Sequence, residues 1–236
     1  MMRATQMITW GFIVFLLCSS TSYAVSYDYS DAPYGNAWHT TDTWQKLGTN
    51  WDSEPSALKI DNDASDDGVW WSIDNGISWG HEGVYAGQNI ILRVDMWSAG
   101  FGKHEYDQVK TWVDFNQDGI FQNDDTELVI AEQFFKPSNM IVDASLPGFI
   151  PGPSVINSYF VAVVIPENIL GDLWLRARVS CWDTPFEDTT PYGHLWQGEV
   201  EDWKITVSPV PEPATVLLLG IGLIGIASAG RKKLKI

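Results

Sequence analysis

The sequence is poor in cysteine. Only Cys18 and Cys181 occur among its 236 residues. Cys18 lies within residues 1–24, which have the pattern of a signal peptide that is cleaved on export. Cleavage leaves Cys181 alone, and a single cysteine excludes an intrachain disulfide even in an oxidising compartment. The stability of the folded chain must therefore come from its core and its polar contacts.

Basic residues are also few. The chain has 14 Lys and Arg against 30 Asp and Glu. Five of the basic residues and one acidic residue lie outside residues 25–209, so this body carries 9 basic and 29 acidic residues and a net charge of about −20. Such a charge excludes nucleic acid and anionic lipid as good partners and favours dissolved cations. The acids cluster beside Gly and Asn, which distinguishes them from a plain solvated surface.

Catalytic signals are weak. The four histidines, at positions 39, 81, 104 and 194, lie in no metalloprotease or nucleophile motif, and Cys181 has no neighbouring basic residue that would lower its thiol pKa. Paired carboxylates are frequent, but spacing along the chain does not fix the separation in space that glycosidase chemistry needs. We therefore expect a protein without enzymatic activity.

Long apolar runs occur only towards the two ends. Residues 1–24 contain Arg3, an apolar run from Ile8 to Cys18 and a small-residue exit before Ala24. This pattern is typical of a secretory signal helix that is recognised by the Sec export machinery and cut after Ala24. A buried N-terminal strand is the alternative. Leu17 precedes Cys18 where a lipidated cysteine would follow a small residue, which argues against a lipid anchor.

The second apolar run, residues 214–229, contains no charge. Its 16 residues fall just short of the roughly 17 to 25 that a membrane-spanning helix needs, so we expect a transmembrane helix that inserts but anchors weakly. Arg231, Lys232 and Lys233 follow it and should stay in the cytoplasm under the positive-inside rule. The body of the protein is then outside the cytoplasm, in agreement with the signal peptide.

A Pro-Glu-Pro motif, Pro211, Glu212 and Pro213, directly precedes this run. Together with the short apolar helix and the basic tail, residues 210–236 resemble the PEP-CTERM sorting signal of Gram-negative bacteria that make extracellular polysaccharide. The resemblance implies recognition of the motif by an exosortase, an integral-membrane transpeptidase or protease. It also implies transient anchoring in the inner membrane and delivery to the cell surface or extracellular matrix. A plain C-terminal anchor is the alternative.

The body has the periodicity of strands. Residues 173–180 alternate Leu, Leu, Ala and Val with more polar or aromatic residues, the pattern of a half-buried strand. Similar short runs, separated by Gly, Pro, Asn and Asp, occur at residues 69–73, 90–97, 109–115, 127–135, 158–165 and 200–207. No stretch keeps an amphipathic helical pattern for three turns. We predict an all-β fold, an antiparallel β-sandwich with long acidic loops over residues 25–209, in which residues 25–65 wrap the sandwich as loops.

One acidic loop has the spacing of a calcium site. In residues 114–125, side chains that bear oxygen recur at alternate positions before Gly119, and the loop lies between two predicted strands. The calcium-loop template makes the ligands Asp114, Asn116, Asp118, the backbone carbonyl of Ile120, and Asp125. A turn capped by its own Asp and Asn side chains is the alternative.

Several separated motifs of the body resemble those of the GEVED domain. They lie at residues 28–33, 47–48, 52–55, 66–69, 112–121, 175–179 and, as Gly-Glu-Val-Glu-Asp, 198–202. The resemblance implies a β-sandwich module of bacterial secreted and surface proteins, with no defined ligand. Two departures are an acidic run, residues 61–68, that is shorter than the family's, and Trp203 where the family commonly has Tyr.

The acids of the last motif need partners. In a strand, Glu199 and Glu201 point to one face, and Asp202 points to the other. Two carboxylates on one face repel unless an arginine or a cation lies between them. Arg176 and Arg178 would give a structural role. A metal shared with nearby acids would instead make a second acidic site of Asp66, Asp67, Glu199 and Glu201.

Tryptophan is abundant, with 13 residues, of which only Trp10 lies in the signal peptide. The others cannot all lie inside a sandwich whose strands show alternate residues to solvent, so we expect some exposed rings, which can stack on sugars. The sequence thus predicts an exported surface or matrix protein with a structural or adhesive role, stabilised by calcium. The alternative is a carbohydrate-binding module that recognises extracellular polysaccharide through exposed tryptophans.

Overall fold

The computed structural model describes residues 27–40, 44–51, 66–211, 218–224 and 226. The predicted signal peptide, Glu212, Pro213 and the basic tail at Arg231, Lys232 and Lys233 lie outside these residues. Residues 218–224 are helical. Among the described residues, no helix is long and apolar enough to cross a membrane.

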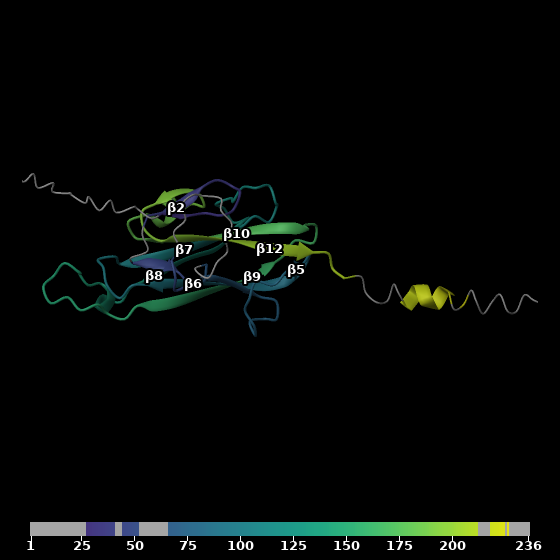
Figure 1. Cartoon of the computed structure of the whole chain (residues 1–236), viewed down its shortest axis with the longest axis horizontal. Coiled ribbons are helices and arrows are strands. Elements are labelled where there is room, and N and C mark those ends of the chain that lie inside the picture. The colour runs from purple at the N-terminus through teal and green to yellow at the C-terminus, as the bar shows by residue number, and fades with distance from the viewer. Residues whose placement is uncertain (1–26, 41–43, 52–65, 212–217, 225, 227–236) are drawn as a thin grey trace, which may run out of the picture.

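The described body is built from strands (Figure 1). The strands are β1 (Asp28–Tyr29), β2 (Ala37–His39), β3 (Gln45–Leu47), β4 (Val69–Ser72), β5 (Val84–Tyr85), β6 (Asn89–Ser98), β7 (Tyr106–Val113), β8 (Leu128–Phe135), β9 (Val155–Val164), β10 (Gly171–Cys181), β11 (Gly193–Leu195) and β12 (Glu199–Ser208). Two short 3-10 helices, η1 (Ser138–Met140) and η2 (Phe186–Asp188), lie in loops. The prediction of an all-β fold is confirmed, and all seven predicted strands are present.

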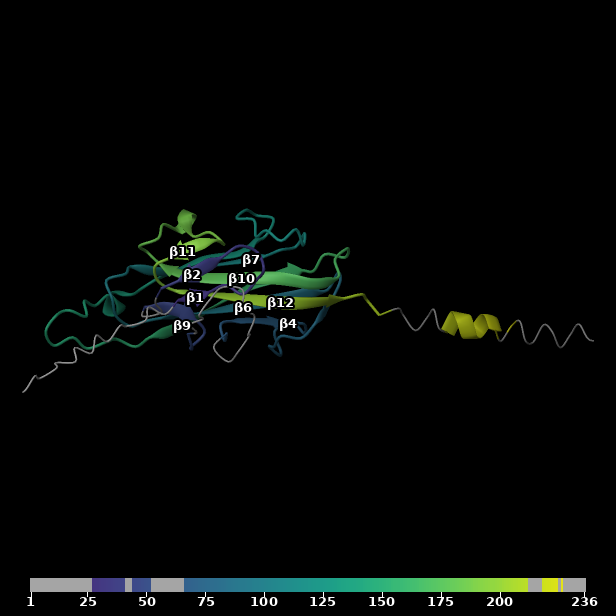
Figure 2. The ribbon, with the colours of Figure 1, turned by 45° about the horizontal axis from the view of Figure 1, so that its top comes forward.

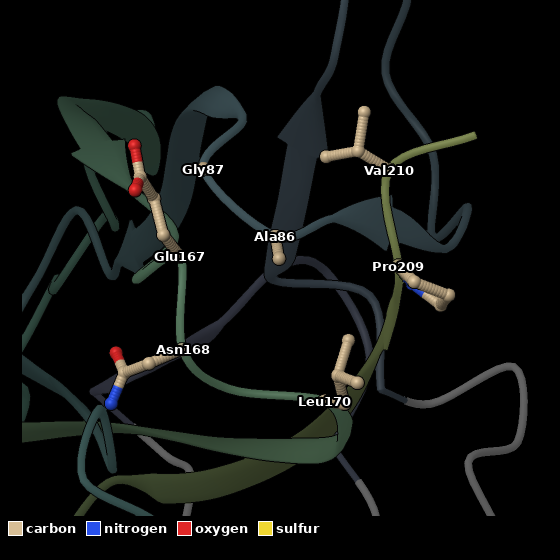
Figure 3. A pocket seen from close by; sticks show the side chains of 7 residues that line it. All are labelled: Ala86, Gly87, Glu167, Asn168, Leu170, Pro209 and Val210. Carbon is tan, nitrogen blue, oxygen red and sulfur yellow. The ribbon is translucent and has the colours of Figure 1, made fainter. Parts of the chain in front are cut away.

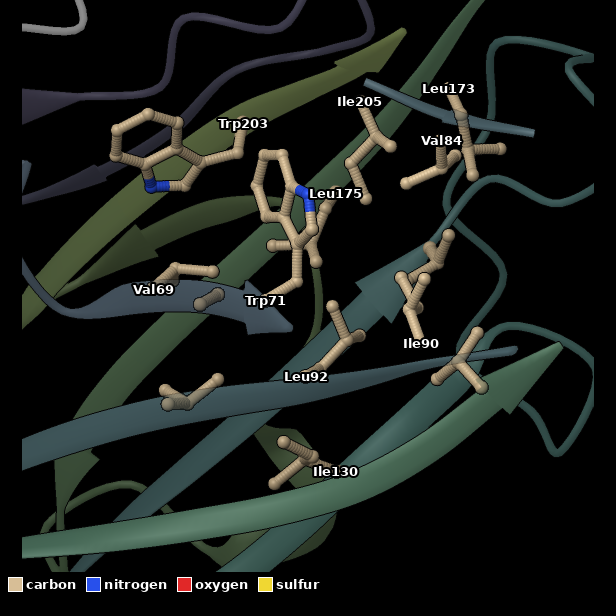
Figure 4. Packing of buried hydrophobic residues seen from close by; sticks show 14 of the residues in the cluster. Val69, Trp71, Val84, Ile90, Leu92, Ile130, Leu173, Leu175, Trp203 and Ile205 are labelled. Atoms are coloured by element: carbon tan, nitrogen blue, oxygen red, sulfur yellow. The ribbon is translucent and has the colours of Figure 1, made fainter. Parts of the chain in front are cut away.

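Two sheets form the sandwich. One has the order β5-β12-β10-β7-β8, and in the other β6 pairs with β3, β4 and β9. The pairings within these sheets are antiparallel except for the short parallel pair of β12 with β5. The alternating apolar residues of both sheets meet in one buried core, where Trp71 of β4 packs edge-on against Trp203 of β12 (Figure 4).

A third, smaller sheet, β1-β2-β11, covers the outer face of the five-stranded sheet (Figures 1 and 2). β1 and β2 come from the segment that we expected to form loops, and so does β3 of the sandwich. These strands have only two or three residues, too few for an alternating pattern to be visible in the sequence. β10 and β12 are therefore covered on both faces, which explains how charged residues on their outer face become fully enclosed.

Candidate metal centre

The predicted calcium loop connects β7 to β8, as expected, and is anchored in the sandwich. Asp114 directly follows β7, is 1% exposed, and donates its backbone N–H to the Trp174 carbonyl on β10 at 3.0 Å. Gly119 has φ of 80°, a left-handed conformation that strains any residue with a Cβ atom. The backbone bond therefore holds the start of the loop against β10, and the turn at Gly119 reverses the chain beyond it.

The template side chains accept hydrogen bonds from the backbone of this turn. Asp114 accepts the backbone N–H groups of Asp118 at 3.2 Å and Gly119 at 3.1 Å. Asn116 Oδ1 also accepts the Asp118 N–H, at 2.8 Å, and Asp118 Oδ1 accepts that of Ile120, at 2.9 Å. These bonds are those of a turn capped by its own side chains. They place the first three template oxygens around one turn but do not distinguish a capped turn from a metal loop.

Glu127, which the template omits, favours a metal loop over a capped turn. Asp125 at the template's twelfth position is exposed, whereas Glu127, two residues later, is 1% exposed. Glu127 Oε2 accepts the Gln122 N–H at 2.8 Å, and the buried Oε1 has no hydrogen-bond partner among the described residues. A capped turn does not require a second buried acid with an unpartnered oxygen.

The carboxylates of the loop lie close enough together to raise one another's pKa values. Burial, and then the charges of Asp114, Asp118 and Asp124, raise the pKa of Glu127 to about 7. Burial is also the largest cause that raises the pKa of Asp114, with the Asp118 charge adding to it. Backbone N–H groups oppose these shifts: Gln122 lowers the pKa of Glu127, and Gly119 lowers that of Asp114. A cation placed among these carboxylates would relieve both the repulsion and the unpaired oxygen.

A hard divalent cation suits these donors. Calcium takes six to eight oxygen ligands from carboxylates, amide oxygens, backbone carbonyls and water. Asp114, Asn116, Asp118 and Glu127 offer side-chain oxygens, and Ile120 offers its carbonyl. The signal for Glu127 in the sequence is an acid immediately before an apolar strand, two residues beyond the end of the template.

The acidic motif of β12 is built differently, with protein partners for its carboxylates. Asp202 receives two bonds from the guanidinium of Arg176, at 2.7 and 2.8 Å, and accepts the Ala32 N–H at 2.7 Å. Glu199 and Glu201 point to the other face, where they accept the N–H groups of Leu47 and Gly68 in the opposing layer. The motif thus joins β12 to the layers on both of its sides.

Two family models match the chain, one for the GEVED domain over residues 108–206 and one for the PEP-CTERM protein-sorting motif over residues 209–233. The chain carries both elements. No curated protein matches the sequence. The GEVED match begins within β7 and ends within β12, so it includes the candidate metal loop and the acidic motif that gives the domain its name. The PEP-CTERM motif implies an exported, exosortase-processed protein of Gram-negative bacteria.

One interpretation of the sequence expected Arg176 and Arg178 of the GEVED domain to pair with Glu199 and Glu201. In the structure they do not. Arg176 lies opposite Asp202 in the strand register, and Arg178 donates to the carbonyls of Thr190, Tyr192 and Gly193. Both arginines project to the outer face, towards the small sheet, because they alternate with the core residues of β10. The expectation missed that backbone N–H groups of another layer could satisfy the two glutamates.

Of the four acids of the predicted second site, Glu201 and Asp67 are close enough for their charges to interact. Glu201 accepts the N–H of Gly68, next to Asp67, and the Trp203 indole N–H at 3.1 Å. Burial, with a smaller effect of the Asp67 charge, raises the pKa of Glu201 to about 8. Asp67 itself accepts hydrogen bonds from Thr49 and Asn50. These partners give Glu199, Glu201 and Asp67 structural roles, and Asp66 is half-buried beside them.

A Gly-x-Ser-x-Gly pattern occurs at residues 76–80, in the turn after β4. In a hydrolase nucleophile elbow, this pattern turns from a strand into a helix and exposes the serine to a histidine base. Here Ser78 Oγ donates to Asp74 Oδ2 at 2.6 Å, and Asp74 also accepts the Ser78 N–H. The serine therefore caps a turn, and its hydroxyl donates to a carboxylate and not to a histidine base.

The tryptophans divide between core and surface, as expected. Trp71 and Trp112 are fully buried, whereas Trp196 is 62% and Trp182 40% exposed. Trp196 ends an aromatic row on the small sheet, which we define as Tyr29, Trp38, His194 and Trp196. Its successive ring centroids lie 6.4, 5.5 and 6.1 Å apart, because Tyr29 and His194 are the cross-strand neighbours of Trp38.

An open pocket of about 540 Å³ lies at the end of the sandwich next to the start of the sorting motif (Figure 3). Its lining consists of Ala86, Gly87, Glu167, Asn168, Leu170, Pro209 and Val210. None of the predicted site residues contributes to it. Two polar side chains on an open, mixed surface do not define a chemistry, so the metal loop is the better candidate site.

Proposed function

We propose that the chain is an exported, non-enzymatic structural or adhesive component of the cell surface or extracellular matrix, stabilised by calcium in the loop 114–127. The sorting motif supports export and exosortase processing. The observation that carries the calcium proposal is the buried Glu127 carboxylate, whose Oε1 lacks a partner beside Asp114 and Asp118.

Calcium in this loop would act as a staple for the sandwich. Asp114 follows β7 and Glu127 precedes β8, so a shared ion would tie together the ends of two neighbouring strands. With Cys181 as its single mature cysteine, the chain cannot form the disulfide that many exported domains use for the same purpose. An ion supplied by the medium would stabilise the protein only after export, where calcium is abundant.

Sorting and surface function can be tested in the producing bacterium by replacing Pro211 and Pro213 with Ala. We expect the parent chain at the cell surface or in the matrix, and the variant retained in the membrane fraction, because exosortase recognition depends on the Pro-Glu-Pro motif. Cell attachment should fall both in the variant and in a deletion strain. A parent chain that stays in the cytoplasm, or a deletion that leaves attachment and matrix cohesion unchanged, would contradict the proposal.

Carbohydrate binding is the second candidate function, favoured by the aromatic row. Its outer member, Trp196, exposes most of its ring beside the exposed His194, so an apolar face and a polar hydrogen-bonding group adjoin. Sugar rings are recognised by this combination, since their C–H faces stack on indole while their hydroxyls seek polar partners. The row lies on the small sheet, whereas the candidate metal loop connects β7 to β8.

Substituting Trp196 by Ala should weaken any glycan binding by about tenfold, which corresponds to about 1.4 kcal/mol of lost stacking. The measurement is binding of the purified chain to a glycan array and to the producer's own polysaccharide. Trp182→Ala is the matched control, because Trp182 is exposed but lies outside the row. A blank array for the parent chain would eliminate carbohydrate binding and leave the structural role untouched.

A further inference from the structure

A second group of metal-ligating side chains lies at the other end of β7 from the calcium loop. His104 precedes β7, Cys181 ends β10, and Asp183 lies in the turn that follows. One ligand atom from each of these residues lies within 4.8 Å of the other two. His104 is 8% exposed and Cys181 is 2% exposed, while the Asp183 side chain is 55% exposed. The group is therefore a buried pair of donors with one carboxylate at the solvent edge.

The imidazole of His104 has unmet bonding capacity. Its buried Nδ1 has no hydrogen-bond partner among the described residues, and its Nε2 lies 4.0 Å from Asp183 Oδ2, beyond hydrogen-bond distance. A buried nitrogen in this state destabilises the folded chain, because its lost hydrogen bond to water is not replaced. Trp44 and Trp182 pack around the ring, with centroids 5.4 and 6.3 Å from it, and fix its position. Aromatic packing thus holds the ring beside the thiol, while neither ring nitrogen has a hydrogen-bond partner among the described residues.

We propose that His104, Cys181 and Asp183 bind a borderline divalent transition metal, with zinc as the best match. Imidazole nitrogen, thiolate sulfur and carboxylate oxygen are the three donor types of protein zinc sites, and a sulfur donor excludes calcium and magnesium. Three protein ligands leave a fourth position, which water can fill from the exposed Asp183 side.

Binding requires only a local adjustment. Zinc–ligand bonds of about 2.0–2.3 Å bring tetrahedral donors to roughly 3–4 Å from one another, somewhat closer than the present limit of 4.8 Å. Asp183 is the member free to move, because its side chain is at the surface, whereas His104 and Cys181 belong to the packed interior. Burial raises the pKa of Cys181 to about 12, so the metal must displace the thiol proton.

Cobalt titration of the full chain tests this site, in a Cys18→Ser background that makes Cys181 the sole cysteine. Cobalt(II) substitutes for zinc, and its bond to a thiolate gives a near-ultraviolet charge-transfer band together with the visible bands of a tetrahedral ion. We expect these bands, their loss on addition of zinc, and their absence in Cys181→Ser. His104→Gln and Asp183→Asn should each weaken cobalt binding about tenfold or more.

Matched variants keep the test decisive. His194→Gln, which removes an exposed histidine outside the group, should leave the cobalt spectrum unchanged. If the Cys181 or His104 variants fail to fold, Asp183→Asn still tests the site, because it alters a ligand at the surface. The proposal is overturned if the parent shows no sulfur-to-cobalt band at a saturating concentration, or if the band survives in Asp183→Asn and His104→Gln. Asp114→Asn with Asp118→Asn should keep cobalt binding, so failure of the zinc site is separable from failure of the calcium loop.

Discussion

Replacing Asp114 and Asp118 together by Asn should abolish the calcium-induced rise in melting temperature. At a calcium concentration 100 times the dissociation constant, binding adds about 2.7 kcal/mol to the stability of the folded chain. For a domain of this size, that is a rise of about 5 to 10 °C. In chelator, the double variant should melt at or above the parent temperature, because the substitution removes buried negative charge.

Single substitutions at the end of the loop test whether the ion is bound by Asp125, as the template predicts, or by Glu127, as the structure suggests. Glu127→Gln should remove the calcium response, because it replaces the buried carboxylate whose oxygen is unpartnered. Asp125→Asn should preserve it, because the charge of Asp125, unlike those of Asp114 and Asp118, is not among the causes that raise the pKa of Glu127. Melting curves in calcium and in chelator give both results. The opposite outcome, with Asp125 essential and Glu127 dispensable, would restore the template ligand set and refute the set that includes Glu127.

Substituting Asp202 by Ala should destabilise the protein by about 3–5 kcal/mol, measured by denaturant unfolding. The side chains of Asp202 and Arg176 are both 0% exposed, and the two bonds between them are short. Removing the carboxylate leaves a guanidinium buried without its counter-charge. It also removes the acceptor of the Ala32 N–H, a bond that links the segment between β1 and β2 to β12. The loss is large because desolvation of Arg176 is no longer offset.

The exposed pair Lys204 and Asp172 is the matched control on the same two strands. Its atoms lie 3.4 Å apart, with side chains 42% and 51% exposed, so Asp172→Ala should cost less than about 1 kcal/mol. Arg176→Met combined with Asp202→Leu should recover most of the stability lost in Asp202→Ala, since apolar residues of similar volume avoid the buried charge. Equal losses of stability in Asp202→Ala and Asp172→Ala would show that burial does not determine how much these ion pairs contribute to the free energy of unfolding.

The long strands were predictable because each carries its own alternating pattern. Residues 173–180 are an example, since Leu173, Leu175, Ala177 and Val179 all reach the core. The sequence could not indicate β1, β2 and β11, which are too short to show a period and exist because they cover the charged outer face of β10 and β12. Their strand structure depends on tertiary contacts that no local pattern encodes.

The candidate sites were predictable to different degrees. Local spacing indicated the candidate calcium loop and three of its proposed side-chain ligands, but the position of Glu127 depends on how the loop joins β8. The partners of Glu199 and Glu201 are backbone groups before β4 and in β3, which adjoin β12 only after the sheets pack. Likewise, His104 and Cys181 are far apart in the sequence and meet because β7 pairs with β10.

The most direct test of the calcium account is a calorimetric titration of the purified chain with calcium, run beside Glu127→Gln. The account predicts one bound ion in the parent, a matching rise in its melting temperature, and neither effect in the variant. If the parent shows no binding heat and melts at the same temperature in calcium and in chelator, the loop is an acidic hairpin connection and calcium does not stabilise this protein.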